Sequence, residues 1–181
     1  MKSLLALIAV ACLAGIAFAQ QSNPPQPNLE NQKLAIWHGE WTYEGTTHTT
    51  VLGSGYKSMG RMTGRPVQNG FASEFLYVEK GSAGETRYLE IDFWDPAIKR
   101  YAYIYLGNDG SVERGSFAMK GNVTTFEGAF TAEGRPYKVR GVETVAPDGQ
   151  SFTKQIELSA DGNTWVPFST SKYLKVKTAA K

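Results

Sequence analysis

The chain has 181 residues with 19 basic and 17 acidic side chains, so its formal net charge is +2. This length favours one domain, and the nearly balanced charge argues against a dedicated nucleic-acid binder, which usually carries a basic stripe. A single cysteine excludes a disulfide framework and a cysteine-based metal cage, while 41% hydrophobic and 12% aromatic residues exclude a disordered chain.

Residues 1–19 have the pattern of an export signal. Lys2 provides a positive start, an apolar run follows over residues 4–17, and Ala17-Phe18-Ala19 matches the small-x-small cleavage rule. The run is short for a membrane helix, which needs about 20 apolar residues, and no second run follows. We therefore expect cleavage before Gln20, a periplasmic or secreted location, and no stable membrane insertion after cleavage.

Residues 20–28 contain three prolines and no large apolar side chain, which predicts an extended, flexible tether. The next segment, 29–37, predicts a short helix that is capped by Asn28 and ended by Gly39. Its residues near one helical face are Leu29, Lys33, Ile36 and Trp37. A helix this short depends on packing for its stability. We therefore assign it, with the strands that follow, to one domain over residues 29–178.

From Glu40 onward, a period-two pattern is interrupted by turn residues at regular intervals. These turn signals lie at 53–55, 68–70, 81–84, 95–96, 108–110, 121–122, 133–134, 148–149 and 161–163. They separate ten segments of strand length, which predicts hairpins joined into an antiparallel meander. Closing that sheet removes its exposed edges, so the expected fold is an all-β barrel of about ten strands. Glycines inside strands fit the bends of a tightly curved sheet, at Gly60, Gly115, Gly128 and Gly141.

Three motifs resemble a known family. Gly39-Glu40-Trp41 resembles the Gly-x-Trp signature of lipocalin-like, or calycin, barrels. Residues 93–101, with the sequence Phe-Trp-Asp-Pro-Ala-Ile-Lys-Arg-Tyr, resemble the aromatic-Asp-Pro…Lys/Arg-Tyr hairpin of secreted bacterial calycin-like domains of unknown function. Residues 161–165 resemble the Asp-Gly-x-x-Trp turn that closes those domains. The resemblance implies a calycin-like barrel and brings no established activity or functional residues.

The sequence offers little material for a metal, a cofactor or a nucleophile. Its two histidines, His38 and His48, do not have the spacing of a zinc site. The nitrobindins, haem-binding relatives of this barrel, ligate iron through a histidine late in the chain, and no histidine follows His48 here. There is no Gly-x-Ser-x-Gly elbow. We therefore expect no cofactor, no metal and no nucleophilic catalysis.

Glu90 and Asp92 form the one carboxylate pair that the pattern singles out. They share one face of a predicted strand, where alternate residues lie roughly 6.5–7 Å apart along the strand. That spacing does not exclude paired acid–base work. We expect a solvated strand face, with a carboxylate-dependent hydrolase at the barrel mouth as the alternative function.

Aromatic residues give the positive indication of a binding site. Tyrosines alternate with apolar residues from Tyr101 to Leu106, so one face of this strand would meet the lumen. The opposite face would form a patch for a partner or a homodimer. Arg140 would anchor a carboxylate if its face looked inward. The candidate ligand-binding residues are Trp41, Tyr43, Tyr101, Tyr103, Tyr105 and Arg140.

These observations predict an exported barrel that binds a small, largely apolar ligand in its lumen, without nucleic acid. A lumen filled by its own side chains is the competing structural interpretation. A protein-interaction or homodimerisation module is the competing function.

Overall fold

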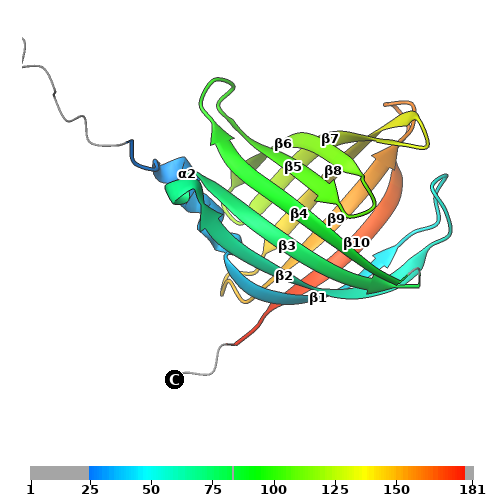
Figure 1. The fold of residues 1–181 in the computed structure, drawn as a ribbon, viewed down its shortest axis with the longest axis horizontal. Helices are drawn as coiled ribbons and strands as arrows, with labels where there is room; N and C mark the ends of the chain where they lie inside the picture. The colour runs from blue at the N-terminus through cyan, green and yellow to red at the C-terminus, as the bar shows by residue number, and fades with distance from the viewer. Residues whose placement is uncertain (1–24, 83, 178–181) are drawn as a thin grey trace, which may run out of the picture.

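Ten antiparallel strands close into one barrel in the computed structural model, which describes residues 25–82 and 84–177 (Figure 1). Each strand pairs with its neighbours in the sequence, and β1 pairs with β10 to complete the cylinder. The strands are β1 Gly39–Thr47, β2 Tyr56–Val67, β3 Ala72–Gly81, β4 Gly84–Asp95, β5 Arg100–Gly107, β6 Val112–Lys120, β7 Val123–Ala132, β8 Arg135–Val145, β9 Ser151–Ser159 and β10 Val166–Lys175. The predicted fold class is confirmed.

The predicted turns all lie at the junctions of consecutive strands, with Gly81, Gly84 and Asp95 as strand ends. In the β4–β5 hairpin, Asp95 Oδ1 accepts a hydrogen bond from the Ala97 backbone N–H at 2.9 Å, which stabilises the turn at the Asp-Pro motif. The predicted export signal lies outside the described residues. Among those residues, no helix combines the length and apolar character needed to cross a membrane.

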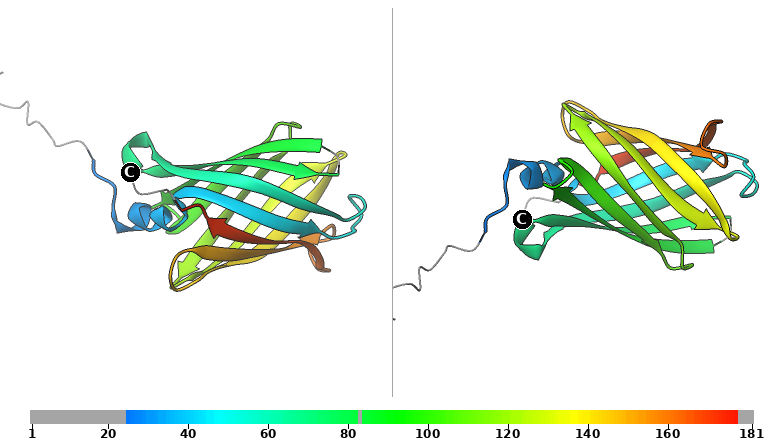
Figure 2. Two further views of the ribbon diagram at one scale, coloured as in Figure 1. Left: turned by 90° about the horizontal axis from the view of Figure 1, so that it is seen from below. Right: turned by 90° about the horizontal axis from the view of Figure 1, so that it is seen from above.

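A short helical segment plugs one end of the barrel (Figure 2). It consists of α2 Leu29–Lys33 and the 3₁₀-helix η1 Leu34–Trp37. Asn28 and Asn31 exchange side-chain-to-backbone hydrogen bonds of 3.1 and 3.0 Å, so the predicted Asn28 cap is confirmed as a capping box.

The buried face of this segment differs from the predicted one. The buried residues are Asn31, Leu34 and Trp37, whereas Leu29 is 74% exposed. These buried residues are three positions apart in the sequence. The chain tightens into a 3₁₀-helix after Lys33, and side chains three positions apart share a face of such a helix.

Residues from the family-like motifs attach this plug to the barrel. Trp41 is fully buried, and its Nε1–H donates to the Trp37 carbonyl at 2.9 Å. The Tyr101 hydroxyl donates to Glu30 Oε2 at 2.6 Å, while its ring stacks on Phe117 at a centroid distance of 4.7 Å. Both aromatic residues therefore form the floor beneath the lumen.

Inward-facing glycines give the barrel room for its aromatic side chains. Four aromatic–glycine pairs face each other on adjacent strands: Tyr43 with Gly60, Phe75 with Gly64, Tyr103 with Gly115, and Phe126 with Gly141. Each ring lies over its glycine, so closely that a Cβ added to Gly60 would come within 2.5 Å of the Tyr43 ring. The rings consequently lie along the wall and leave the centre open.

We expect Gly60→Ala to destabilise the barrel by about 1–3 kcal/mol, because the new methyl group would push the Tyr43 ring toward the lumen. Urea denaturation would measure the loss. If the clash is the cause, Tyr43→Leu should remove much of the penalty of Gly60→Ala in a double-mutant cycle. Strictly additive losses would contradict this role of the glycine.

Candidate functional site: the barrel lumen

A cavity of about 590 Å³ occupies the lumen above the plug. It extends from Trp37 and Phe117 at the floor to the loops at the opposite end, where Leu52, Gly110 and Glu133 line it. Sites for small molecules usually have volumes of roughly 300–1,000 Å³. The lumen is therefore hollow, and its volume is that of a ligand site.

Tyrosines form much of the cavity wall. Those that line it are Tyr43, Tyr56, Tyr77, Tyr88, Tyr103, Tyr105 and Tyr173. Tyr43 stacks on Tyr173 at a centroid distance of 4.7 Å, and Tyr88 stacks on Tyr105 at 4.9 Å. The wall thus offers flat apolar faces together with phenolic hydroxyls.

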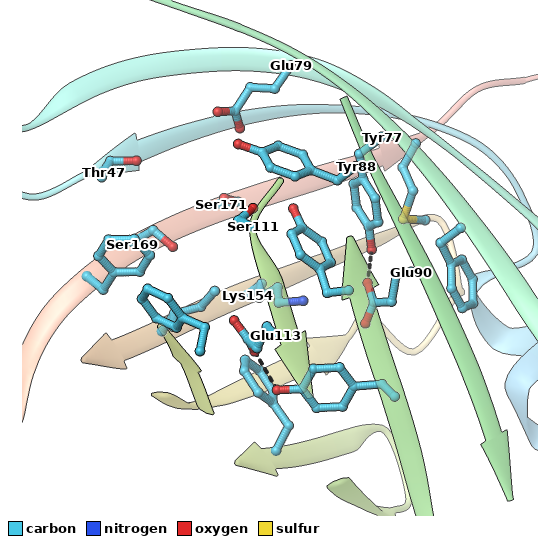
Figure 3. A pocket seen from close by; sticks show the side chains of 18 of the residues that line it. Thr47, Tyr77, Glu79, Tyr88, Glu90, Ser111, Glu113, Lys154, Ser169 and Ser171 are labelled. Atoms are coloured by element: carbon cyan, nitrogen blue, oxygen red, sulfur yellow. Dashed lines mark hydrogen bonds between the residues drawn. The ribbon is translucent and has the colours of Figure 1, made fainter. Parts of the chain in front are cut away.

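Carboxyl groups line the same cavity wall as these rings. Tyr77 donates a hydrogen bond to Glu90 Oε2 at 2.8 Å, and Tyr103 donates to Glu113 Oε1 at 2.5 Å. Figure 3 shows Glu90, Glu113 and Lys154 pointing into the same space from β4, β6 and β9. Burial, followed by the nearby carboxylates, raises the pKa of Tyr77 and Tyr103, so both phenols remain protonated donors.

Lys154 is the one basic residue among the described residues that line the cavity. Its Nζ lies 2.9 Å from Glu143 Oε1, across the β8–β9 pair, and 5.0 Å from the centroid of the Phe126 ring. Burial alone would lower the pKa of Lys154, but the negative charges of Glu143 and Glu90 outweigh burial and raise it. The lysine is therefore a fixed ammonium ion and not a nucleophilic amine.

Asp92 lies deeper on the same face of β4 as Glu90. The residue is 5% exposed, and its Oδ1 has no hydrogen-bond partner among the described residues. Burial, and then the charges of Glu90 and Glu143, raise the pKa of Asp92 well above its usual value. Burial also raises the pKa of Glu90, against the opposing effect of Lys154.

The prediction that Glu90 and Asp92 form a solvated strand face is wrong, because both line the lumen. The inward side of β4 carries Tyr88 and Trp94 as well as the two acids, so the acids follow the aromatic alternation into the interior. Asp92 is also buried well inside the lumen and does not stand at its mouth.

These raised pKa values predict a pH dependence of stability. Glu90, Asp92 and Glu113 bind protons more tightly in the folded than in the unfolded protein, so their contribution to stability falls as the pH rises above the unfolded carboxyl pKa toward the raised folded values. Asp92→Asn should therefore be more stable than the wild type at neutral pH, with a smaller advantage near pH 4. Urea denaturation at several pH values would test this, and a difference that is independent of pH would contradict it.

The structure places the six predicted ligand-binding residues in three settings. Tyr43, Tyr103 and Tyr105 line the cavity together. Trp41 and Tyr101 belong to the floor described above. Arg140 points outward, where its Nε donates to Glu157 Oε2 at 2.6 Å and its guanidinium lies 4.3 Å from the centroid of Trp165, so the condition for a lumenal anchor is not met.

Sequence reasoning missed Glu113, Glu143 and Lys154. Their signal was available in the alternation, since each charged residue shares its strand face with buried residues. Lys154, for example, stands between Phe152 and Leu158 on the inward side of β9. A charged residue at an apolar position of the pattern is the feature that would have found them.

Within the described residues, no group of three acidic, histidine or cysteine side chains is arranged to hold a metal ion. What the site provides is a closed cylinder, plugged at one end, with an aromatic wall and buried carboxyl groups.

Comparison with known proteins finds similarity in fold to solved structures. The chain is similar in fold to Rv2717c from M. tuberculosis, with 10% sequence identity, a TM-score of 0.60, and a match covering 84% of this chain and 100% of that chain. A de novo designed fluorescence-activating β-barrel matches 79% of this chain and 96% of its own at 10% identity and a TM-score of 0.42. No protein-family model and no curated protein sequence matches. The likeness therefore extends to the fold, and the calycin family assignment stays a prediction.

Proposed function

We propose that this protein binds a small amphipathic molecule in its lumen. The observation that carries the proposal is the cavity of about 590 Å³ above a packed floor. Its tyrosine wall supplies contact area at low conformational cost, and its buried carboxyl groups supply orientation.

The proposed ligand is less apolar than the sequence suggested. A purely apolar molecule would cover Asp92 Oδ1 and the carboxyl groups of Glu90 and Glu113 without offering them a hydrogen bond. Covering polar groups in this way costs free energy, so a matching ligand carries hydrogen-bond donors beside its apolar body.

A variant that fills the lumen tests this function. Ser171 lines the cavity, whereas the next residue back along β10, Thr170, is exposed on the outside. We expect Ser171→Trp to abolish binding of aromatic fragments detected by protein-observed NMR, and Thr170→Trp to leave binding unchanged. Native mass spectrometry of wild-type protein would identify any molecule that copurifies. Saturable binding that survives Ser171→Trp, or no binding of any fragment, would overturn lumenal binding.

We also propose that the protein is exported and belongs to the calycin-like family that its motifs resemble. The support for export is the apolar run over residues 4–17 and the Ala17-Phe18-Ala19 cleavage site in the sequence. Expression of the full chain in a bacterial host should yield a mature protein that begins at Gln20. Intact-mass measurement would check this, and a full-length chain retained in the cytoplasm would contradict it.

A homodimer is the second candidate, and the outer face of β3–β5 favours it. Leu76, Leu89 and Leu106 stand opposite one another on these three strands, with Leu76 45% and Leu106 38% exposed. Ile91 and Ile104 form the next outward pair along the strands. Such a continuous apolar row is typical of a surface that associates.

Sedimentation equilibrium would test the dimer. We expect Leu76→Arg with Leu106→Arg to shift a concentration-dependent dimer to monomer, because two charges would be introduced on the apolar row. Leu174→Arg, at an exposed position of β10, is the matched control and should not shift it. A wild-type protein that is monomeric at millimolar concentration would exclude this candidate.

A further inference from the structure

We propose that the lumen selects organic cations: molecules in which an ammonium or a similar N–H-bearing cationic group is attached to an apolar body, with Asp92 as the anchor. This inference rests on the proposed lumenal binding and names the class of ligand. Four observations carry it: the charge of the lining, the unpaired oxygen of Asp92, the aromatic wall, and the environment of Lys154.

The lining of the cavity is strongly acidic although the chain as a whole is not. Among the described residues, seven carboxyl side chains line it against one lysine, namely Glu79, Glu90, Asp92, Asp109, Glu113, Glu133 and Glu143 against Lys154. The whole chain carries a net charge of +2. The lining acids that are ionised all carry the same sign of charge, and a cavity with one sign of charge and low-dielectric walls concentrates counter-ions, which here are cations.

Within the described part of the chain, Asp92 differs from the other deep carboxyl groups because it accepts no hydrogen bond from a tyrosine and has no lysine partner; its one hydrogen-bonding neighbour there is the carboxyl group of Glu90. Glu90 and Glu113 each accept a hydrogen bond from a tyrosine, and Glu143 is paired with Lys154. Asp92 Oδ1 is buried, lines the same cavity and has no partner among the described residues. Buried polar atoms are almost always hydrogen-bonded in folded proteins, so an N–H donor from a ligand would satisfy this oxygen.

The surroundings of Lys154 show how this lumen holds an ammonium group. Its Nζ is placed by one carboxylate, Glu143, and lies over one aromatic ring, Phe126. Tyr77 and Tyr103 belong to the same lining as Asp92, and Tyr103 pairs with Asp92 across β4 and β5. A carboxylate beside aromatic rings is the chemistry that recognises ammonium ligands through charge and cation–π attraction.

Binding of a cation should release a proton. Burial, Glu90 and Glu143 favour the neutral acid form of Asp92, with Lys154 as the opposing positive charge. When an ammonium ligand arrives, Asp92 loses its proton to solvent and becomes the carboxylate of an ion pair. A neutral alcohol of the same shape forms no ion pair and would bind without this release.

Matched sets of ligands test the inference on the mature protein. Each set contains an arylethylamine, the corresponding arylethanol and the corresponding arylpropionate, with phenyl, naphthyl and indolyl groups as the body. Isothermal titration calorimetry in two buffers of different ionisation enthalpy gives both the affinity and the number of protons released. The variants are Asp92→Asn, Glu90→Gln and, as a control, Glu44→Gln, which alters an exposed side chain of β1.

We expect at least one amine to bind about 10-fold or more tightly than its alcohol, with proton release, and its carboxylate analogue to bind least. Asp92→Asn should remove this preference and the proton release, so that the amine and the alcohol bind with affinities within about twofold of each other. Glu44→Gln should change neither. Glu90→Gln, which keeps Asp92, should weaken the preference only in part.

Different results would overturn cation selection and lumenal binding. If alcohols bind as tightly as amines, or if the preference survives in Asp92→Asn, cation selection is wrong and lumenal binding stands. If no member of any set binds, lumenal binding and the cation inference are both overturned. Retained far-ultraviolet circular dichroism of Asp92→Asn, and of Glu90→Gln as the second lumenal variant, would show that lost binding is not lost folding.

Discussion

Replacing Lys154 with methionine is expected to lower the free energy of unfolding by about 3–5 kcal/mol at neutral pH. The change removes the one basic side chain among the described residues of the lumen and leaves Glu143 without its partner at 2.9 Å. Both side chains are largely shielded from water, at 18% and 12% exposure, so solvent compensates little for the lost charge. Urea denaturation of the two proteins would measure the loss.

The size of this loss should depend on pH in a definite direction. Without the lysine, the lumenal acids hold their protons more tightly, so the folded variant binds more protons than the folded wild type. Its stability should therefore fall more steeply as the pH rises from 4 to 8, and the difference between the proteins should be smallest at acid pH.

Two comparisons isolate the buried pair. Lys172→Met, at an exposed position of β10, should change stability by less than about 0.5 kcal/mol. Removing both partners in Lys154→Met/Glu143→Leu should recover the part of the loss that comes from leaving Glu143 without its partner. A Lys154→Met protein as stable as the wild type would show that the lumenal charges are compensated by water.

Replacing Trp41 with alanine is expected to lower the free energy of unfolding by about 3–5 kcal/mol. The indole is fully buried, packs edge-on against Phe152 at 5.0 Å and donates to the Trp37 carbonyl. Its removal would leave a cavity in the floor and detach the helical plug from β1. Thermal and urea denaturation would both report the loss.

Trp165 provides the matched tryptophan control. It lies on the outer side, where the guanidinium of Arg140 packs over its ring. Trp165→Ala should therefore cost much less than Trp41→Ala. Equal losses would contradict the assignment of Trp41 to the floor. Trp41→Phe should keep part of the packing but lose the Nε1–H hydrogen bond. Its free energy of unfolding should therefore lie between those of the wild type and Trp41→Ala.

The stability of the floor also bears on the proposed binding. The plug is held by hydrogen bonds from Trp41 and Tyr101, two of the residues that the sequence singled out as ligand contacts. In this position they would affect the binding of a ligand only indirectly, through the shape of the lumen. A loss of binding in Trp41→Ala would therefore not by itself identify Trp41 as a contact residue.

The alternation of side chains along each strand explains why part of the site was predictable. Tyr103 and Tyr105 fall on the same face because side-chain direction alternates with every residue of a strand. Gly60 and Gly115 were expected to permit bending, but their close contacts with Tyr43 and Tyr103 depend on the register between neighbouring strands. Register is a property of the assembled sheet, so the open lumen could not be inferred from composition.

By itself, the sequence determined the turns, the number of strands, the antiparallel order and the cap at Asn28, because turn chemistry, period-two alternation and helix capping act over a few residues. The tertiary structure decided which charges share the interior. Glu90 and Lys154 are 64 positions apart in the sequence, and they influence each other because closure of β1 onto β10 turns β4 and β9 toward a common lumen. A local pattern carries no information on what lies across that space, and the low dielectric of the enclosed barrel is what makes the encounter between these charges strong.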